Sequence, residues 1–234
     1  MRFDIWRRAR AVLLLLGVLL SGACTDRGEP ARNNEGERAS MAPAPGRAGS
    51  TFVYECGDGL RFTARIEGET AWLFLPSGTI SLPHVEAASG AKYSDGSVTF
   101  WSKGESAMLE GGNQPRTECS NNRAEAIWED AKLRGADFRA TGNEPGWYLE
   151  ISREYGILLV TAYGTERYEF APTEPSSDSA LRKTTYKAAQ AGHELTVTLE
   201  GRDCADSMSG AKFETTVTVM IDGNKLTGCG RPLH

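Results

Sequence analysis

The sequence lacks long hydrophobic segments, histidine clusters and paired cysteines at CxxC spacing. Its apolar run at residues 11–20 covers only ten positions, too few to cross a hydrocarbon core of about 30 Å as a helix. It contains three histidines, His84, His193 and His234, and none stands at a metal-ligand spacing from another. The sequence therefore favours neither a multispan membrane protein nor a metal site.

An excess of basic residues is also missing. The chain has 26 Lys and Arg against 31 Asp and Glu, a net charge of −5. Phosphate contacts need a basic surface, so we do not expect nucleic acid as a partner. The acidic balance favours basic partners through electrostatic steering, or it serves solubility alone. No GxSxG turn surrounds Ser207, and we predict a binding protein without a cofactor rather than an enzyme.

The N-terminus has the layout of an export signal. Four arginines stand within the first ten residues, and the apolar run at 11–20 follows them. Cys24 comes directly after three small residues and resembles a bacterial lipobox, with Ser21 where leucine is usual. We predict a lipoprotein signal peptide at 1–23 and an acylated, palmitate-bearing Cys24; the alternative is ordinary secretion. Thr25 is not the aspartate that favours inner-membrane retention, so we expect the outer membrane, facing the periplasm.

Composition divides the exported part into four segments. Residues 24–50 are rich in Pro, Gly, Ala and charge, which predicts a flexible tether. Residues 51–120 and 137–234 each alternate apolar and polar positions between frequent turn signals, as antiparallel β domains do. Residues 121–136 lie between them as a linker. The predicted fold class is mainly β: a small antiparallel barrel or sandwich, a short helix, then a second antiparallel β-rich domain. The predicted strands are 52–56, 60–66, 72–75, 79–82, 98–101, 107–110, 147–151, 156–163, 195–199, 217–221 and 226–229.

The linker has helix boundaries at both ends. Asn122 can serve as N-cap, with Glu125 three residues later. Gly135 is suited to end the helix. We expect this helix to pack on one or both domains.

The cysteine count fits an exported protein. If Cys24 is acylated, four of the five cysteines remain, and four allow three connectivities. The domain division puts two cysteines in each half, which makes Cys56–Cys119 and Cys204–Cys229 the natural disulfides in an oxidising compartment.

One group of loop residues in the first domain suggests recognition of an anionic group. Ser89 and Gly90 stand in a loop that glycine can bend sharply. Tyr93 offers an aromatic ring with a polar tip, and Lys103 stands at a tight hairpin end. Each has an ordinary alternative: a turn-capping serine, a packed tyrosine and a solvated lysine.

An ordered series of residues runs through the whole first domain: Tyr54, Cys56, 73–76, 89–93, 100–104, 107–110 and Cys119. Through this series, residues 52–119 resemble the family of membrane-bound inhibitors of c-type lysozyme. The resemblance implies a small antiparallel β-barrel closed by Cys56–Cys119 and a protein partner, c-type lysozyme. It also implies that the loops bearing Ser89 and Lys103 enter the active-site cleft of that enzyme.

Aromatic residues of the barrel leave a second function open. We predict Trp72, Phe74, Phe100 and Trp101 mainly as core residues. Aromatic rings on a barrel face can also stack on sugars. The alternative is therefore a peptidoglycan- or glycan-binding envelope lipoprotein without inhibitory activity.

Three motifs stand out in the second domain, at 138–147, 204–210 and 228–231. Through them, residues 137–234 resemble an uncharacterised family of bacterial envelope domains and, more loosely, the META domain. This resemblance implies no activity. Five polar residues of this domain could form a cluster, although turn formation around Cys204–Cys229 explains them equally well: Asn143, Glu144, Asp206, Ser207 and Arg231.

Overall fold

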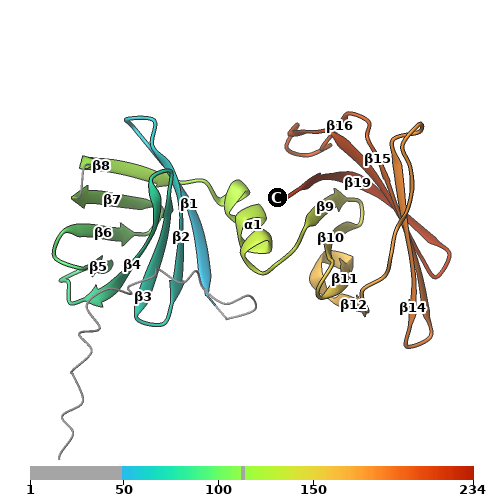
Figure 1. The fold of residues 1–234 in the computed structure, drawn as a ribbon, viewed down its shortest axis with the longest axis horizontal. Coiled ribbons are helices and arrows are strands. Elements are labelled where there is room, and N and C mark those ends of the chain that lie inside the picture. Colours follow the sequence, from blue (N-terminus) through green and yellow to red (C-terminus); the bar gives the residue numbers. More distant parts are fainter. Residues whose placement is uncertain (1–48, 112–113) are drawn as a thin grey trace, which may run out of the picture. The chain divides into compact units, whose positions relative to one another are not determined.

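The computed structural model describes residues 49–111 and 114–234 (Figure 1). The predicted signal peptide, Cys24 and the tether up to residue 48 lie outside the described residues. Within the described part of the chain, no helix is long and apolar enough to cross a membrane.

The first β unit is a closed eight-stranded antiparallel barrel, which confirms the predicted barrel. Each strand pairs with the next in sequence, and β8 returns to pair with β1, so that Cys56 lies opposite Cys119. Closure leaves no free strand edge. The strands are β1 Ser50–Cys56, β2 Arg61–Glu67, β3 Thr70–Leu75, β4 Gly78–Val85, β5 Ala91–Ser94, β6 Val98–Lys103, β7 Ser106–Gly111 and β8 Gln114–Asn121.

Side-chain alternation sets the inside of the barrel. In β2, Phe62 and Ala64 point into a core that also holds Leu73 and Phe100. The alternation predicts Arg65 on the solvated face, but its side chain is only 1% exposed. It forms ion pairs with Glu67 at 2.8 Å and with Asp130 of the following helix at 3.2 Å. The helix therefore covers this part of the outer barrel face, which strand periodicity alone does not predict.

Helix α1, Arg123–Leu133, forms where the sequence predicts it. The Asn122 side chain accepts a hydrogen bond from the backbone N–H of Glu125, so the N-cap is confirmed. Gly135 has φ +91° and donates to the carbonyl of Lys132, while the N–H of Ala136 donates to Ala131. These contacts form the glycine-ended C-cap that satisfies the last helix carbonyls.

The second β unit is a nine-stranded antiparallel sheet. Its strand order is β12-β11-β10-β9-β19-β18-β15-β14-β13, and a separate two-stranded ribbon joins β16 and β17. The predicted strand at 156–163 is too long, because a 3-10 turn, η1 Ala162–Gly164, follows β11. The strands are β9 Phe138–Asn143, β10 Gly146–Ser152, β11 Gly156–Thr161, β12 Glu166–Phe170, β13 Ser176–Asp178, β14 Lys183–Gln190, β15 His193–Glu200, β16 Cys204–Ala205, β17 Lys212–Phe213, β18 Thr215–Ile221 and β19 Asn224–Pro232.

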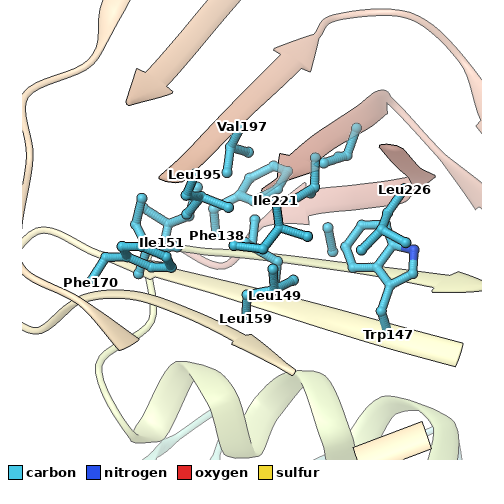
Figure 2. Packing of buried hydrophobic residues seen from close by; sticks show 14 residues of the cluster. Phe138, Trp147, Leu149, Ile151, Leu159, Phe170, Leu195, Val197, Ile221 and Leu226 are labelled. Atoms are coloured by element: carbon cyan, nitrogen blue, oxygen red, sulfur yellow. The ribbon is translucent and has the colours of Figure 1, made fainter. Parts of the chain in front are cut away.

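One hydrophobic cluster lies on the inner face of this sheet (Figure 2). Leu149, Leu159 and Val197 are fully buried in it, and the rings of Phe138 and Trp147 belong to the same cluster. A buried side chain of this size stabilises the fold by about 1.5–3 kcal/mol relative to its exposure. The cluster combines residues from both ends of the segment, which holds the two halves of the sheet together.

Both predicted disulfides are present. Cys56–Cys119 joins residues 63 positions apart and Cys204–Cys229 residues 25 positions apart. Each bond lies within its own β unit. The domain division therefore led to the right pairs among the three possible connectivities.

Candidate functional site

Two loops of the barrel lie against each other at one end of β5 and β6. Ala91 pairs with Ser102, so the residues just before β5 run beside the end of β6. Gly90 has φ +70°, and a Cβ atom there would lie 2.3 Å from the carbonyl oxygen of Ser102. Only a glycine allows this backbone approach. The fold thus brings Ser89 and Lys103, which are distant in sequence, to neighbouring positions.

Trp101 holds the Ser89 loop in place through a hydrogen bond. Its indole Nε1 donates a hydrogen bond of 2.8 Å to the backbone carbonyl of Ser89. Ser89 itself is exposed. Trp101 is half-buried on the outer barrel face, with the Lys92 ammonium 5.9 Å from its ring centre. The prediction of Trp101 as a core residue is therefore wrong, whereas Phe100, on the opposite face of β6, is fully buried. The same prediction is wrong for Trp72 and Phe74, which are half-buried and alternate with the buried Leu73 along β3.

Lys103 ends β6 with an exposed side chain. It pairs with Ser106 across a tight hairpin in which Gly104 has φ +59°. In the part of the chain that the structure describes, its ammonium has no ion-pair partner within 4.0 Å. The ammonium is therefore available to an anionic group on another molecule.

The carboxylate nearest to Lys103 in sequence has other partners. Glu105, at the hairpin tip, forms an ion pair with Arg123 and accepts a hydrogen bond of 3.1 Å from Asn121. The Arg123 hydrogen bond is the main cause that lowers the pKa of Glu105, with Asn121 next. Glu105 thus stays ionised and is held by the last residue of β8 and the first residue of α1. The sequence pattern did not identify Glu105 or Arg123, because their contact joins a hairpin to a helix terminus.

Tyr93 lies inside the barrel. It is 4% exposed, with ring centres at 5.4 Å from His84 and 6.1 Å from Phe100. Burial, with a smaller contribution from Glu69, raises the pKa of its phenol. Tyr93 was predicted among the binding residues, but in this position it supports the loop from the core and offers little surface to a partner.

A shallow groove of about 360 Å³ opens beside Lys103. Its floor follows one cross-strand row, in which Trp101 pairs with Met108 and Met108 with Glu118. Ser106 and Ser120 lie at its edge. The groove adds an apolar recess to the exposed ammonium and hydroxyl. Strand register, rather than a motif, places its residues side by side.

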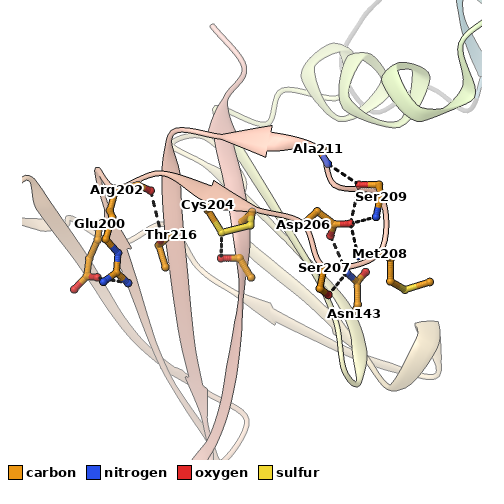
Figure 3. The surroundings of a disulfide bond; sticks show 12 residues. Asn143, Glu200, Arg202, Cys204, Asp206, Ser207, Met208, Ser209, Ala211 and Thr216 are labelled. Atoms are coloured by element: carbon orange, nitrogen blue, oxygen red, sulfur yellow. Dashed lines mark hydrogen bonds and ion pairs between the residues drawn. A yellow bond between two sulfur atoms is a disulfide. The ribbon is translucent and has the colours of Figure 1, made fainter.

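The polar cluster considered in the second unit forms only in part (Figure 3). The Asn143 amide donates to Asp206 at 2.8 Å and to the Ser207 hydroxyl at 3.1 Å. The second oxygen of Asp206 accepts from the backbone N–H groups of Met208 and Ser209. The Ser209 backbone hydrogen bond is the main cause that lowers the pKa of Asp206. These contacts build a turn.

The other two residues that the sequence suggested for this cluster lie apart from the turn. Arg231 forms an ion pair with Glu125 of α1 at 2.7 Å, and Glu144 is exposed. Within residues 49–111 and 114–234, no group of three or more His, Cys, Asp or Glu side chains is placed to hold a metal ion. The chemistry of the barrel site is that of a donor surface, an ammonium beside a hydroxyl, suited to acidic groups.

Comparison with known proteins gives a consistent result for the barrel. The family model of the membrane-bound lysozyme inhibitor of c-type lysozyme matches residues 54–117. A Yersinia enterocolitica protein named as such an inhibitor is 45% identical over 89 residues, which cover 37% of this chain and 74% of that relative. A Pseudomonas aeruginosa protein of the same name is 36% identical over 63 residues, 25% of this chain and half the length of that relative. No solved structure gives a significant match.

Proposed function

The chain belongs to the family of membrane-bound lysozyme inhibitors of c-type lysozyme, and we propose that its barrel inhibits such an enzyme by inserting the Ser89 and Lys103 loops into the active-site cleft. The relatives are named as inhibitors, which are binding proteins and not enzymes. The observation that carries the proposal is the exposed Lys103 ammonium beside the Ser89 loop.

The chemistry of the target explains why these groups suit it. Lysozyme cleaves glycosidic bonds with two carboxyl groups, one protonated and one ionised. An ammonium placed between them pairs with the carboxylate, and a hydroxyl can hydrogen-bond the second carboxyl group. Both contacts fill the substrate position and shift the pKa values that catalysis needs. In this proposal Lys103 makes the charge contact and Ser89 the hydrogen bond.

The surrounding residues support this division of roles. Arg123 and Asn121 hold Glu105, so the hairpin carboxylate does not neutralise the lysine beside it. Gly90 permits the close approach of the two loops, and Tyr93 supports the first loop from inside the barrel. The loops are thus held in place before a partner arrives, which lowers the entropy cost of binding.

The envelope location is the second part of the proposal. The family is membrane-bound by name, and Cys24 supplies a site for acylation with palmitate after removal of residues 1–23. Residues 24–50 then act as a tether that carries the folded part into the periplasm from the outer membrane. We assign residues 51–120 to the inhibitor, 121–136 to the linker, and 137–234 to a domain with META-like resemblance.

A muramidase assay with the full chain and a c-type lysozyme tests the inhibitor function. We expect inhibition by the wild-type chain and a 10- to 1,000-fold weaker inhibition constant for Lys103→Ala. Truncating one partner of a desolvated charge pair costs about 2–5 kcal/mol, at about 1.4 kcal/mol per decade. Ser89→Ala removes a single hydrogen bond and should weaken inhibition less.

Lys225→Ala is the matched control, because Lys225 is also an exposed hairpin lysine but lies in β19 of the second unit. It should inhibit like the wild type. An unchanged inhibition constant for Lys103→Ala, with the barrel folded, would refute the loop-insertion mechanism. Retention of the chain on cell-wall sacculi without any inhibition would favour the glycan-binding alternative.

A further inference from the structure

Helix α1 is docked on the barrel through a buried ion pair. The Arg65 side chain is only 1% exposed, and its guanidinium contacts the Asp130 carboxylate of the helix at 3.2 Å. The Thr51 hydroxyl of β1 donates a hydrogen bond of 2.8 Å to the same carboxylate. A buried guanidinium needs such partners, because an uncompensated charge in the interior is costly. The barrel therefore holds the second half of α1 through a contact that the barrel itself requires.

Polar contacts also hold the start of α1 on the barrel. The backbone N–H of Asn122, the N-cap residue, donates to the carbonyl of Val53 in β1 at 2.7 Å. Arg61 of β2 donates to the carboxylate of Glu125, in the first turn of the helix, at 3.0 Å. Because α1 is held near both of its ends, its first residue, Arg123, has a defined place on the barrel.

That place is the hairpin that carries Lys103. Gly104 and Glu105 form the two-residue loop between Lys103 and Ser106, which pair with each other. The Arg123 guanidinium is bidentate to the Glu105 carboxylate: its Nε lies 2.9 Å from one oxygen, and a terminal nitrogen contacts the other. The first residue of α1 thus reaches the loop that presents the Lys103 ammonium.

A free Glu105 carboxylate would oppose the role proposed for Lys103. Gly104 alone separates the two residues in sequence, so an unpaired carboxylate could approach the ammonium and compete with an external anion for it. It would also bring a negative charge towards the two carboxyl groups of a lysozyme cleft. Across residues 49–111 and 114–234, the ion pair that the structure gives Glu105 is with Arg123. The contact therefore neutralises the unfavourable charge of the hairpin.

From these contacts we propose that Arg123 is a positioning residue of the inhibitor, which acts on Lys103 through Glu105. Its guanidinium occupies the carboxylate that would otherwise compete for the ammonium and repel the target. Arg123 lies beyond residues 54–117, so the family resemblance assigns it no role. The functional inhibitor of this chain extends from the barrel into α1. The inference rests on the proposed inhibition of lysozyme by the barrel.

A double-mutant cycle on the full chain tests this role in the muramidase assay. Arg123→Ala frees the Glu105 carboxylate, and we expect about three- to fivefold weaker inhibition, the size of an exposed charge interaction. Glu105→Gln alone should inhibit like the wild type, because it removes the competing charge. The double variant should recover the inhibition that Arg123→Ala loses. If Arg123 only supported the fold, removal of a second side chain would not restore function.

Arg167→Ala is the matched control, because Arg167 is also an exposed arginine paired with an exposed glutamate, Glu169, but lies in the second unit. It should inhibit like the wild type. The loss in Arg123→Ala should shrink as the salt concentration rises, because the charges of Arg123 and Glu105 are 77% and 53% exposed and are screened by ions. A loss that does not depend on salt would contradict the proposed electrostatic role.

NMR titration of the Glu105 carboxyl group gives a readout without lysozyme. The Arg123 hydrogen bond is the largest cause that lowers the pKa of Glu105, so this pKa should rise towards its ordinary value of 4.5 in Arg123→Ala and stay unchanged in Arg167→Ala. An unchanged pKa in Arg123→Ala, or a double variant that inhibits as weakly as Arg123→Ala, would overturn the proposal.

The same assay separates this inference from the inhibitor function. Inhibition by the wild type without any loss in Arg123→Ala would overturn the role of Arg123 alone. Absence of inhibition by the folded wild type would refute the inhibitor function and this role with it. Urea unfolding of each variant should differ little from that of the wild type, because exposed ion pairs contribute little to stability.

Discussion

The barrel and the second sheet are built from similar short antiparallel strands but end in different surfaces. In the barrel, β8 pairs with β1 and every edge is used, so the loops are the parts that project freely. The second sheet stays open between its edge strands β12 and β13, and its outer face carries grooves. Closure therefore leaves the loops as the projecting parts of the barrel, whereas the open sheet leaves one face uncovered.

The two units also bury charged side chains of opposite sign on their outer faces. In the barrel, the buried Arg65 lies on the outer face and pairs with Asp130 of α1. In the second sheet, the buried Glu150 lies on the outer face and pairs with Arg134, the residue that follows α1. The helix thus supplies an anion to the first unit, and its C-cap residue supplies a cation to the second. Buried charges of this kind need such partners.

Removal of each disulfide should give the largest difference in behaviour between the two units. Replacing Cys56 and Cys119 by alanine removes a cross-link between residues 63 positions apart. Chain entropy predicts that this loss lowers the unfolding free energy by about 4 kcal/mol. The same change at Cys204 and Cys229, 25 residues apart, should cost about 3.5 kcal/mol. Urea unfolding measures both losses. Lysozyme inhibition should disappear only in the barrel variant; equal inhibition by both would contradict independent roles of the two units.

Two glycines provide a smaller and more local comparison. Gly90→Ala puts a Cβ atom 2.3 Å from the Ser102 carbonyl at positive φ, so the loop must shift and inhibition should weaken at least about tenfold. Gly142→Ala puts one 2.2 Å from the Trp147 indole nitrogen and should cost about 1–3 kcal/mol of stability through overpacking. Inhibition by the second variant should stay unchanged. A Gly90→Ala chain with full inhibition would show that the close approach of the loops is dispensable.

Substitution of two turn aspartates, one in each unit, should give the smallest effects, and each substitution should lower the stability of its unit. The backbone N–H of Val98 is the main cause that lowers the pKa of Asp95, as that of Ser209 does for Asp206, from an ordinary value of 3.8. Because both folded pKa values are depressed, each carboxylate stabilises the fold above pH 4 and loses this contribution as the pH falls through the folded pKa.

Asp95→Asn and Asp206→Asn should each cost up to about 1 kcal/mol at neutral pH and flatten the acid side of the stability curve. Titration of the two carboxyl groups by NMR measures the pKa values directly. A value above 3.8 for either group would contradict the proposed hydrogen bonds.

Much of the fold follows from local patterns. The capped helix, both disulfides and the alternating strands of each unit were predicted because each depends on residues close in sequence or on a simple count. The sequence pattern missed β5 and β8 of the barrel and, in the second unit, β9, β12, β13, β14, β16 and β17. β8 carries little hydrophobic signal, and pairing on both sides with β7 and β1 holds it. No local pattern reports such closure.

The sequence offered candidate site residues, but their arrangement in space followed from the tertiary structure. Ser89, Gly90 and Lys103 lie together as the family resemblance implies, whereas Tyr93 is in the core and Trp101 is outside it. The direction of a strand side chain depends on register, and a shift of one residue reverses it. Aromatic character alone therefore could not decide which of these rings faces a partner.

The sequence by itself determined the β class, the helix boundaries and the cysteine pairs, because periodicity, capping and counting act over short distances. The tertiary structure decided which distant groups meet. It placed Ser89 beside Lys103, held Glu105 with Arg123, and docked α1 over the buried Arg65. These contacts arise from strand register and chain closure, which depend on the whole fold and not on any one segment.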